Sequence, residues 1–334
     1  MKNNKPKQIA VVASLVVSSM LVAACGGGGG SGSSGTSNNS SSGSSGSTAS
    51  PTTGNVSTPQ YAAASAQLAI FDTINQQRQQ CGLPAYTENT VLDSAAQAHA
   101  SYMGQNGGTI TDTESSSNPG YTGATYTDRA THFGFPTSTY ATGASAGFYT
   151  NSKLTETAYG QQIAFEWMSG VYHIAVAAWP MTELGVGWNE TTYNGYPEIQ
   201  SSVSMANLQP LSGSLPLTFP CQGTTGVAYA GNGETPTPPN TSGAFGAPVA
   251  VVGNSTDKIT MQTGTMTSTS GTVITLQVLD SSTDPNKLLP AYEGVAYPAT
   301  PLTANTTYTV SLTGTYNGAA FSRTFTFTTG NLVG

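Results

Sequence analysis

Three histidines are the side chains of this chain best suited to metal binding or acid–base catalysis. They are His99, His132 and His173, in a chain of 334 residues. A divalent-metal site needs about three well-placed protein ligands, so these histidines would have to be gathered from three separate segments. No His-Glu-x-x-His or Cys-x-x-Cys motif supplies a more compact site. We therefore interpret His99 as a helix-packing residue and His132 as a surface residue.

Nucleophilic catalysis is the second chemistry to consider, although serines are too plentiful in this chain to be informative. Gly143-Ala-Ser145-Ala-Gly147 matches the letters of the Gly-x-Ser-x-Gly elbow. That elbow places its serine on a sharp turn between a strand and a helix. The surrounding residues 138–152 predict neither element. Ser145 is therefore kept only as the nucleophile of an alternative, serine-based mechanism.

His173 closes the stretch FEWMSGVYH at residues 165–173, six residues after Trp167 and close to the end of an expected helix. Two interpretations of this histidine stay open. In one, the imidazole is structural and caps the helix that ends near Gly170, where a cation suits the helix dipole. In the other, it contacts a ligand. The choice depends on which polar residues lie beside it.

The elements that would position these residues are helices in the first half of the chain, followed by strands. Runs with helical apolar spacing begin near Thr58–Pro59, after Asn89, near Asp128 and at Thr155. Thr58 followed by Pro59 is also a good N-cap and first-turn pair. Later runs predict strands at residues 183–188, 198–205 and 215–219. Helices gathered before strands indicate an α+β fold rather than a wound parallel sheet.

The last third of the chain has the alternation of a small all-β sandwich. Tyr308, Val310 and Leu312 alternate with Thr and Ser, and Asn317–Gly318 suits a two-residue hairpin turn. The pattern resembles the bacterial Ig-like modules of surface proteins, which implies a spacer or adhesion role.

The patterns divide the chain into five parts. These are a lipoprotein signal peptide at 1–25, a Gly/Ser-rich tether at 26–60, a first folded body at 61–228, a linker at 229–242 and the β-sandwich at 243–330. The tether carries no charge and almost no large apolar side chain, which predicts a flexible segment. The linker is recognised by its Gly, Pro and Thr content.

The N-terminal residues predict export and a lipid anchor. Three lysines precede an apolar run that is short for a permanent membrane span, as in a signal peptide. The run ends in Val22-Ala-Ala-Cys25, which resembles the lipobox of bacterial lipoproteins and makes Cys25 the expected lipidation site. An ordinary secretory signal is the alternative. Gly26 after the cysteine resembles the sorting signal for the outer membrane, so we expect an envelope lipoprotein there, facing the periplasm or the exterior.

The charge of the chain argues against nucleic acid as a partner. All sixteen acidic residues but only six of the nine basic residues follow Cys25, so that part carries a formal charge of −10. A negative chain without a run of basic residues does not attract the phosphate backbone. The expected partners are the membrane, through the anchor, and an unidentified ligand or envelope protein.

Cys81 and Cys221 are the two cysteines that remain once Cys25 is lipidated. In an oxidising envelope such a pair is expected to form a disulfide, with two buried thiols as the alternative. The bond requires Cα atoms roughly 4.4–6.8 Å apart.

Residues 61 to about 225 resemble the CAP superfamily of cysteine-rich secretory, antigen-five and pathogenesis-related proteins. The matches recur in the expected order and spacing. They are Ile74-Asn75 with Arg78, Ala95-Ala96 with His99-Ala100, the stretch NPGYTGATYTDRATHFGF, Trp167 with His173, and Leu184-Gly-Val-Gly187. The resemblance implies an α-β-α sandwich.

Metal-binding members of that superfamily hold two histidines and two acids at the floor of a cleft. By this resemblance His173 matches the second histidine, and Asp112 stands where the first is expected, with Glu114 two residues on. Ala144 and Gly170 stand where the two glutamates would lie. The resemblance implies a degenerate cleft with His173, Asp112 and Glu114 as ligand-contacting candidates. Because the two carboxylates are missing, we expect no metal, no cofactor and no catalytic residue in this cleft.

The sequence thus predicts a non-enzymatic, lipid-anchored envelope protein whose CAP-like body binds a ligand or partner. The alternative is an envelope hydrolase, metal-assisted at His173 and Asp112 or serine-based at Ser145. The carboxylates missing at Ala144 and Gly170 favour the binding protein.

Overall fold

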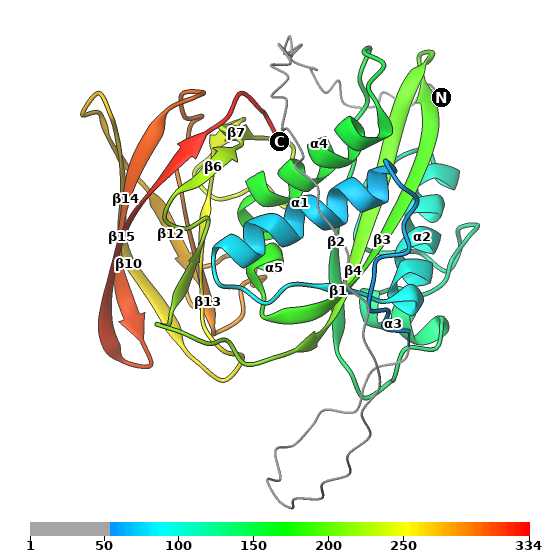
Figure 1. Cartoon of the computed structure of the whole chain (residues 1–334), viewed down its shortest axis with the longest axis horizontal. Coiled ribbons are helices and arrows are strands. Elements are labelled where there is room, and N and C mark those ends of the chain that lie inside the picture. The colour runs from blue at the N-terminus through cyan, green and yellow to red at the C-terminus, as the bar shows by residue number, and fades with distance from the viewer. Residues whose placement is uncertain (1–53) are drawn as a thin grey trace, which may run out of the picture. The chain divides into compact units, whose positions relative to one another are not determined.

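The computed structural model describes residues 54–334, which belong to one compact unit (Figure 1). The predicted signal peptide, Cys25 and residues 26–53 of the predicted tether lie outside the described residues. The helices are α1 (Ala66–Gln80), α2 (Thr90–Gln105), α3 (Tyr126–His132), α4 (Glu156–Ser169) and α5 (Val171–Ala178). None of these helices of residues 54–334 has the length and apolar character needed to cross a membrane.

The strands fall into three groups along the chain. The first four are β1 (Thr87–Glu88), β2 (Ala141–Ala146), β3 (Met181–Tyr193) and β4 (Tyr196–Leu208). The next five are β5 (Leu217–Phe219), β6 (Thr224–Val227), β7 (Ala230–Gly231), β8 (Phe245–Gly246) and β9 (Val249–Val252). The last six are β10 (Ile259–Ser268), β11 (Val273–Thr275), β12 (Gln277–Asp280), β13 (Glu293–Tyr297), β14 (Thr307–Tyr316) and β15 (Ala319–Thr329).

A four-stranded sheet forms the centre of the first body. Its strand order is β1-β3-β4-β2, with β1 parallel to β3 and the other neighbours antiparallel. Helices α2 and α3 lie on one face of the sheet, and α1, α4 and α5 lie on the other (Figure 1). Helices on both faces of a mainly antiparallel sheet form the predicted α-β-α sandwich. The predicted α+β fold class is confirmed.

Small residues on one sheet face let α2 approach closely. Gly185 and Gly187 of β3 share this face with Ser202 of β4. A Cβ atom on Gly187 would lie 2.1 Å from the carbonyl oxygen of Ala96 in α2. Since a carbon atom cannot approach a non-bonded oxygen so closely, a side chain at position 187 would push α2 away from the sheet.

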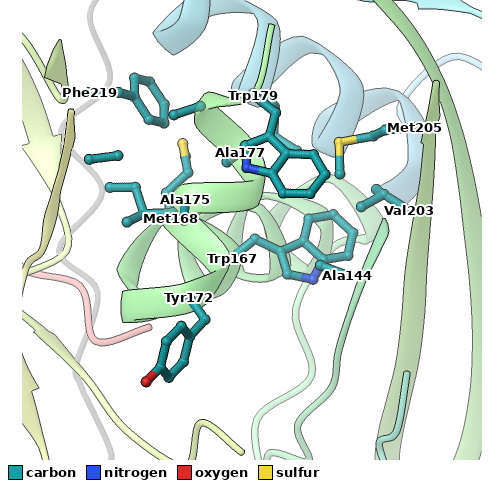
Figure 2. Close-up of a cluster of buried hydrophobic side chains, with 14 of the residues drawn as sticks. Ala144, Trp167, Met168, Tyr172, Ala175, Ala177, Trp179, Val203, Met205 and Phe219 are labelled. Carbon is teal, nitrogen blue, oxygen red and sulfur yellow. The ribbon is translucent and has the colours of Figure 1, made fainter. Parts of the chain in front are cut away.

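The opposite sheet face packs against a large apolar core. Ala144, Val203 and Met205 lie beside Trp167 of α4 and Trp179 at the end of α5 (Figure 2). The Trp167 side chain is only 2% exposed. Burial of apolar surface contributes about 25 cal/mol per Å², so this core is the main source of stability of the first body.

Side-chain caps define the helix starts, with one correction to the sequence prediction. Helix α2 follows Asn89 and α4 starts next to Thr155, as predicted, and the side chains of these two residues cap the helices. Helix α1 begins at Ala66 rather than at Thr58–Pro59, because the Ser65 hydroxyl accepts the third N–H of the helix, at 3.2 Å.

Residues 54–61 are held against the first body, although the predicted tether extends to residue 60. Asn55 forms an antiparallel bridge with Asn89. The Tyr61 hydroxyl donates to Oδ1 of Asp93 at 2.6 Å. These contacts fix the point at which the chain enters the folded unit.

The last third of the chain forms a sandwich of two sheets, with orders β11-β10-β14-β15-β6 and β12-β13-β9-β5. The alternating residues Val310 and Leu312 lie in the apolar core of the sandwich. Strands β14 and β15 turn at Asn317 and Gly318, whose φ angles are 51° and 82°. Two successive positive φ angles are those of a type I′ turn, which explains the Asn-Gly pair.

Two strands from the range predicted for the first body join the sandwich. Strand β5 pairs with β9, and β6 runs parallel to β15. Cys221, in the connection between β5 and β6, is disulfide-bonded to Cys81, the C-cap of α1, with Cα atoms 5.3 Å apart. The predicted disulfide is confirmed.

The two bodies also share one apolar core. The cluster that contains Trp167 and Trp179 continues into Val252 of β9 and Val295 of β13. Nε1 of Trp179 donates to Oε2 of Glu293 in β13 at 2.7 Å. The sandwich therefore packs directly on α5 of the first body.

Candidate functional site

Asp112 lies in the loop between α2 and α3 and is held by Tyr126, the first residue of α3. The Tyr126 hydroxyl donates to Oδ1 of Asp112 at 2.7 Å and shares a hydrogen bond with Oγ of Ser145 at 2.8 Å. Asp112 is exposed, whereas Tyr126 is buried. Burial and the charge of Asp112 raise the pKa of Tyr126 well above its ordinary value, so its hydroxyl remains a donor. We call these three residues the Asp112 cluster.

Glu114, two residues later, points into the protein and meets two basic side chains. Its Oε1 lies 2.9 Å from Nδ1 of His99 and 3.9 Å from Nε of Arg129. All three side chains have 0% exposure. We call His99, Glu114 and Arg129 the buried triad.

His99 has both ring nitrogens in hydrogen bonds. Its Nε2 lies 2.7 Å from the carbonyl oxygen of Thr111. A carbonyl only accepts, so Nε2 carries the proton of that bond. Nδ1 faces the carboxylate of Glu114, and the ring therefore lies between two acceptors. This geometry commits His99 to packing α2 against the loop, in agreement with its helix-packing interpretation.

The buried triad fixes both ends of the loop at residues 111–125. At one end, Nη2 of Arg129 donates to the carbonyl oxygen of Asp112 at 3.0 Å. Near the other end, Oε2 of Glu114 accepts the N–H of Thr122 at 2.6 Å. Buried side chains of the triad therefore hold the backbone of this loop.

The pKa of Glu114 reflects this arrangement. Burial acts to raise it, but hydrogen bonds from His99 and Thr122 and the charge of Arg129 outweigh burial and lower the pKa of Glu114. An ionised carboxylate that is paired and hydrogen-bonded is stable inside a protein. The ionised side chain of Glu114 thus helps to hold the loop, whose tip at residues 115–121 is exposed.

His173 lies in the first turn of α5 and not at the end of α4. Helix α4 ends at Ser169, Gly170 is extended, and α5 begins at Val171. One interpretation of the sequence held that the imidazole caps the end of α4. That interpretation is wrong, because a new helix starts directly after Gly170. Its Nδ1 lies 3.9 Å from Oε1 of Glu234, and the side chain is 20% exposed.

The sheet lies between His173 and the other two candidates. Ser145 and Ala144 are neighbours in β2, so their side chains point to opposite sheet faces. The Asp112 cluster is on the Ser145 side, and α5 packs on the Ala144 side. Within residues 54–334, no hydrogen bond or ion pair joins His173 to Asp112 or to the buried triad.

Ser145 lies inside β2 and not on a turn. It is paired with Ser202 of β4, and the next helix begins only at Glu156. Its hydroxyl faces Tyr126 rather than a histidine. The strand-to-helix elbow that a serine-based hydrolase would need is therefore not formed at Ser145.

Metal-ligating side chains do not gather in the part of the chain that the structure describes. Within residues 54–334, no group of three His, Cys, Asp or Glu residues could hold a metal ion. His132 is exposed on α3, and His99 and His173 lie in the two separate polar groups described above.

Comparison with protein families identifies the first body. Residues 71–205 match the model of the cysteine-rich secretory protein family, CAP. The chain carries a CAP domain. The match begins inside α1 and ends inside β4, and so covers most of the central sheet and the Asp112 cluster. It confirms the resemblance found in the sequence and supports a ligand- or partner-binding role in general. No curated protein matches the chain in sequence.

Sequence reasoning missed the residues that support the CAP candidates. Tyr126 and Arg129 lie in the stretch NPGYTGATYTDRATHFGF, which identified the domain, but no role was assigned to either of them. An arginine in a sequence with only nine basic residues was an available signal for a buried partner of Glu114. Glu234 gave no such signal, because it lies in the predicted linker, 61 residues from His173.

Proposed function

We propose that this chain is a non-enzymatic, lipid-anchored cell-envelope protein whose CAP domain binds a ligand or partner at the loop of residues 111–125. The observation that carries the proposal is the buried triad, whose side chains hold this loop at both ends. A loop that is already ordered loses less conformational entropy on binding. Asp112, exposed and oriented by Tyr126, supplies the charged contact.

The arrangement of the serine and histidine side chains also supports binding rather than catalysis. A general base must lie within hydrogen-bond reach of the proton that it removes. Ser145 is hydrogen-bonded to Tyr126, and His99 is hydrogen-bonded to Glu114 and to a backbone carbonyl. The imidazole of His173 lies beside Glu234, on the other side of the sheet.

A photo-crosslinking amino acid in place of Tyr121, at the loop tip, tests the binding site. Tyr121 is 40% exposed, and Tyr196 in the β3–β4 hairpin is a matched control at 41%. In cells that produce the full-length chain, we expect an adduct from position 121 and none from position 196. Asp112→Asn is expected to reduce the adduct roughly tenfold, because it removes one charge-assisted hydrogen bond.

Asp72→Asn changes an exposed carboxylate on α1 and is expected to leave the adduct unchanged. Equal adducts from positions 121 and 196, or an adduct that Asp112→Asn does not alter, would contradict binding at this loop. Tight, stoichiometric zinc binding by the purified protein that disappears in His173→Ala would instead support the metal-assisted hydrolase.

The lipid anchor is part of the proposal and is supported by Val22-Ala-Ala-Cys25 followed by the uncharged tether. Cys25→Ala is expected to leave an unprocessed precursor without attached fatty acid, because the thiol is the group that is acylated. Labelling of cells with a fatty-acid analogue, followed by membrane fractionation, measures both effects. Normal maturation and membrane retention of Cys25→Ala would contradict the anchor.

A further inference from the structure

The N-terminal end of α5 is occupied by a carboxylate from a distant segment of the chain. Glu234 lies three residues after β7. Its oxygens accept the backbone N–H groups of Val171, Tyr172 and His173 at 2.7, 2.8 and 3.1 Å. The Glu234 side chain is 2% exposed. Three of the N–H groups that a helix leaves without partners in its first turn are therefore bonded to one buried carboxylate.

Gly170 explains why this carboxylate comes from elsewhere. Gly170 is the N-cap of α5 and has no side chain that could accept these N–H groups. A Cβ atom at this position would lie 2.7 Å from Oε1 of Glu234 and 2.9 Å from Nδ1 of His173. The space that a side chain at position 170 would fill is thus taken by a carboxylate on one side and an imidazole on the other.

The attraction for the carboxylate comes from the helix end, and the imidazole of His173 lies beside it. In the part of the chain that the structure describes, the ion pair of Glu234 is with His173, at 3.9 Å, and none is formed with Lys or Arg. Free N–H groups and the helix dipole favour an anion at the start of a helix. Helix α5 has eight residues, so its N-terminal end is well separated from its C-terminal end.

The segment that carries Glu234 is held at both ends. Strand β7 pairs with β8 before it. After it, the Tyr297 hydroxyl of β13 donates to the carbonyl oxygen of Pro239 at 2.7 Å. Between these two points the chain has neither helix nor strand, and buried Glu234, which bonds α5, is flanked by the exposed residues Gly233 and Thr235.

We propose that the N-terminal end of α5, with Gly170 and His173, is a carboxylate-binding site that residues 231–236 occupy as an intramolecular ligand. Glu234 is the group that is bound. When this segment is displaced, the backbone N–H groups of Val171, Tyr172 and His173 are free to bind an acidic side chain on an extended peptide of a partner protein. The segment is therefore an autoinhibitory plug, positioned by the sandwich. The site lies across the sheet from the Asp112 cluster, so the inference goes beyond the proposed function.

Chemical rescue with acetate tests the site in the full chain. Glu234→Ala is expected to lower the midpoint of thermal unfolding. Sodium acetate is expected to restore at least half of the lost midpoint temperature, with a dependence on concentration that follows mass action. Sodium chloride at equal ionic strength is expected to restore none of it. The wild-type chain is expected to show no specific response to acetate, because Glu234 already fills the site.

Two further variants separate a carboxylate site from a general salt effect. Adding Gly170→Ala to Glu234→Ala is expected to abolish the rescue, because the new methyl group would occupy the space of the carboxylate. Glu190→Ala removes an exposed glutamate of β3 and is expected to be insensitive to acetate. If Glu234→Ala is recovered unfolded, its refolding yield in acetate against chloride gives the same comparison.

A synthetic peptide of residues 229–238 tests the class of partner. We expect it to bind the Glu234→Ala chain in calorimetry, and the same peptide with glutamine in place of glutamate to bind at least tenfold more weakly. Equal effects of acetate and chloride on Glu234→Ala would overturn the carboxylate site. Equal binding of the two peptides would overturn recognition of an acidic peptide.

Discussion

At the scale of single residues, Glu293 is a buried carboxyl group at the junction of the CAP domain and the sandwich. Its side chain is fully buried, and its Oε1 has no hydrogen-bond partner within residues 54–334. Burial raises the pKa of Glu293 to about 8, against a smaller opposing effect of the hydrogen bond from Trp179. A neutral carboxyl is far less costly to bury than a carboxylate, so Glu293 is protonated at neutral pH.

Glu293→Gln is expected to change stability little at pH 5 and to raise it at pH 8. In the unfolded chain this carboxyl loses its proton near pH 4.5, but in the folded chain only near pH 8. The contribution of this bound proton to the free energy of unfolding of the wild type is therefore complete below about pH 4.5. It is lost as the pH rises to about 8. Glutamine mimics the neutral acid and carries no such loss.

Denaturant unfolding between pH 5 and pH 9 measures this effect. The difference in free energy of unfolding between Glu293→Gln and wild type should grow to the order of a few kcal/mol by pH 8 and then level off. Glu190→Gln, at an exposed position of β3, is the control and should show no such growth. A difference that does not change with pH would contradict a protonated Glu293.

The sequence was sufficient to name the candidate residues, but it did not reveal which side chains contact them. Asp112 and Glu114 stand two positions apart, yet one is exposed and the other buried. Their separation follows from contacts with Tyr126 and His99, which lie on different helices. Sequence spacing gives no information on such long-range pairs.

At the scale of elements, the local rules worked where the local sequence decides the structure. Asn89 and Thr155 begin helices because their side chains accept the first free N–H groups. Asn317–Gly318 forms the expected turn because both residues have positive φ. The Thr58–Pro59 start was wrong because Ser65 supplies a cap closer to the apolar run of α1.

Two elements escaped prediction because distant contacts determine them. Strand β2 has the sequence ATGASA and lacks the β-branched and aromatic residues typical of strands. Its small residues are required because α3 lies against it: a Cβ atom on Gly143 would lie 2.3 Å from the Tyr126 ring. Helix α5 follows a glycine, Gly170, which supplies no side-chain cap, and the side chain of Glu234 caps it instead.

At the scale of the whole molecule, the CAP domain and the sandwich are coupled in three ways. They share an apolar core, they are crosslinked by Cys81–Cys221, and Glu234 bonds the start of α5. The sequence indicated two bodies and the disulfide, but the composition of a strand does not reveal which sheet it joins. For that reason β5 and β6, within residues predicted for the first body, could not be assigned to the sandwich.

Removal of the disulfide separates the covalent coupling from the coupling by the shared core. The bond closes a loop with a sequence separation of 140 residues. The chain-entropy model assigns such a crosslink about 4–5 kcal/mol. Cys81→Ser combined with Cys221→Ser is therefore expected to lower the midpoint of thermal unfolding by roughly 10 °C. Wild type in reductant should behave like the double variant, and reductant should not affect the double variant.

The shape of the calorimetric transition then shows what couples the two bodies. Trp167 and Trp179 belong to the same apolar cluster as Val252 and Val295 of the sandwich. Unfolding of either body alone would expose this shared surface at a cost of about 25 cal/mol per Å². We therefore expect one cooperative transition in the double variant, at the lower temperature. Two separate transitions would contradict this expectation, because the disulfide rather than the core would then hold the bodies in one unit.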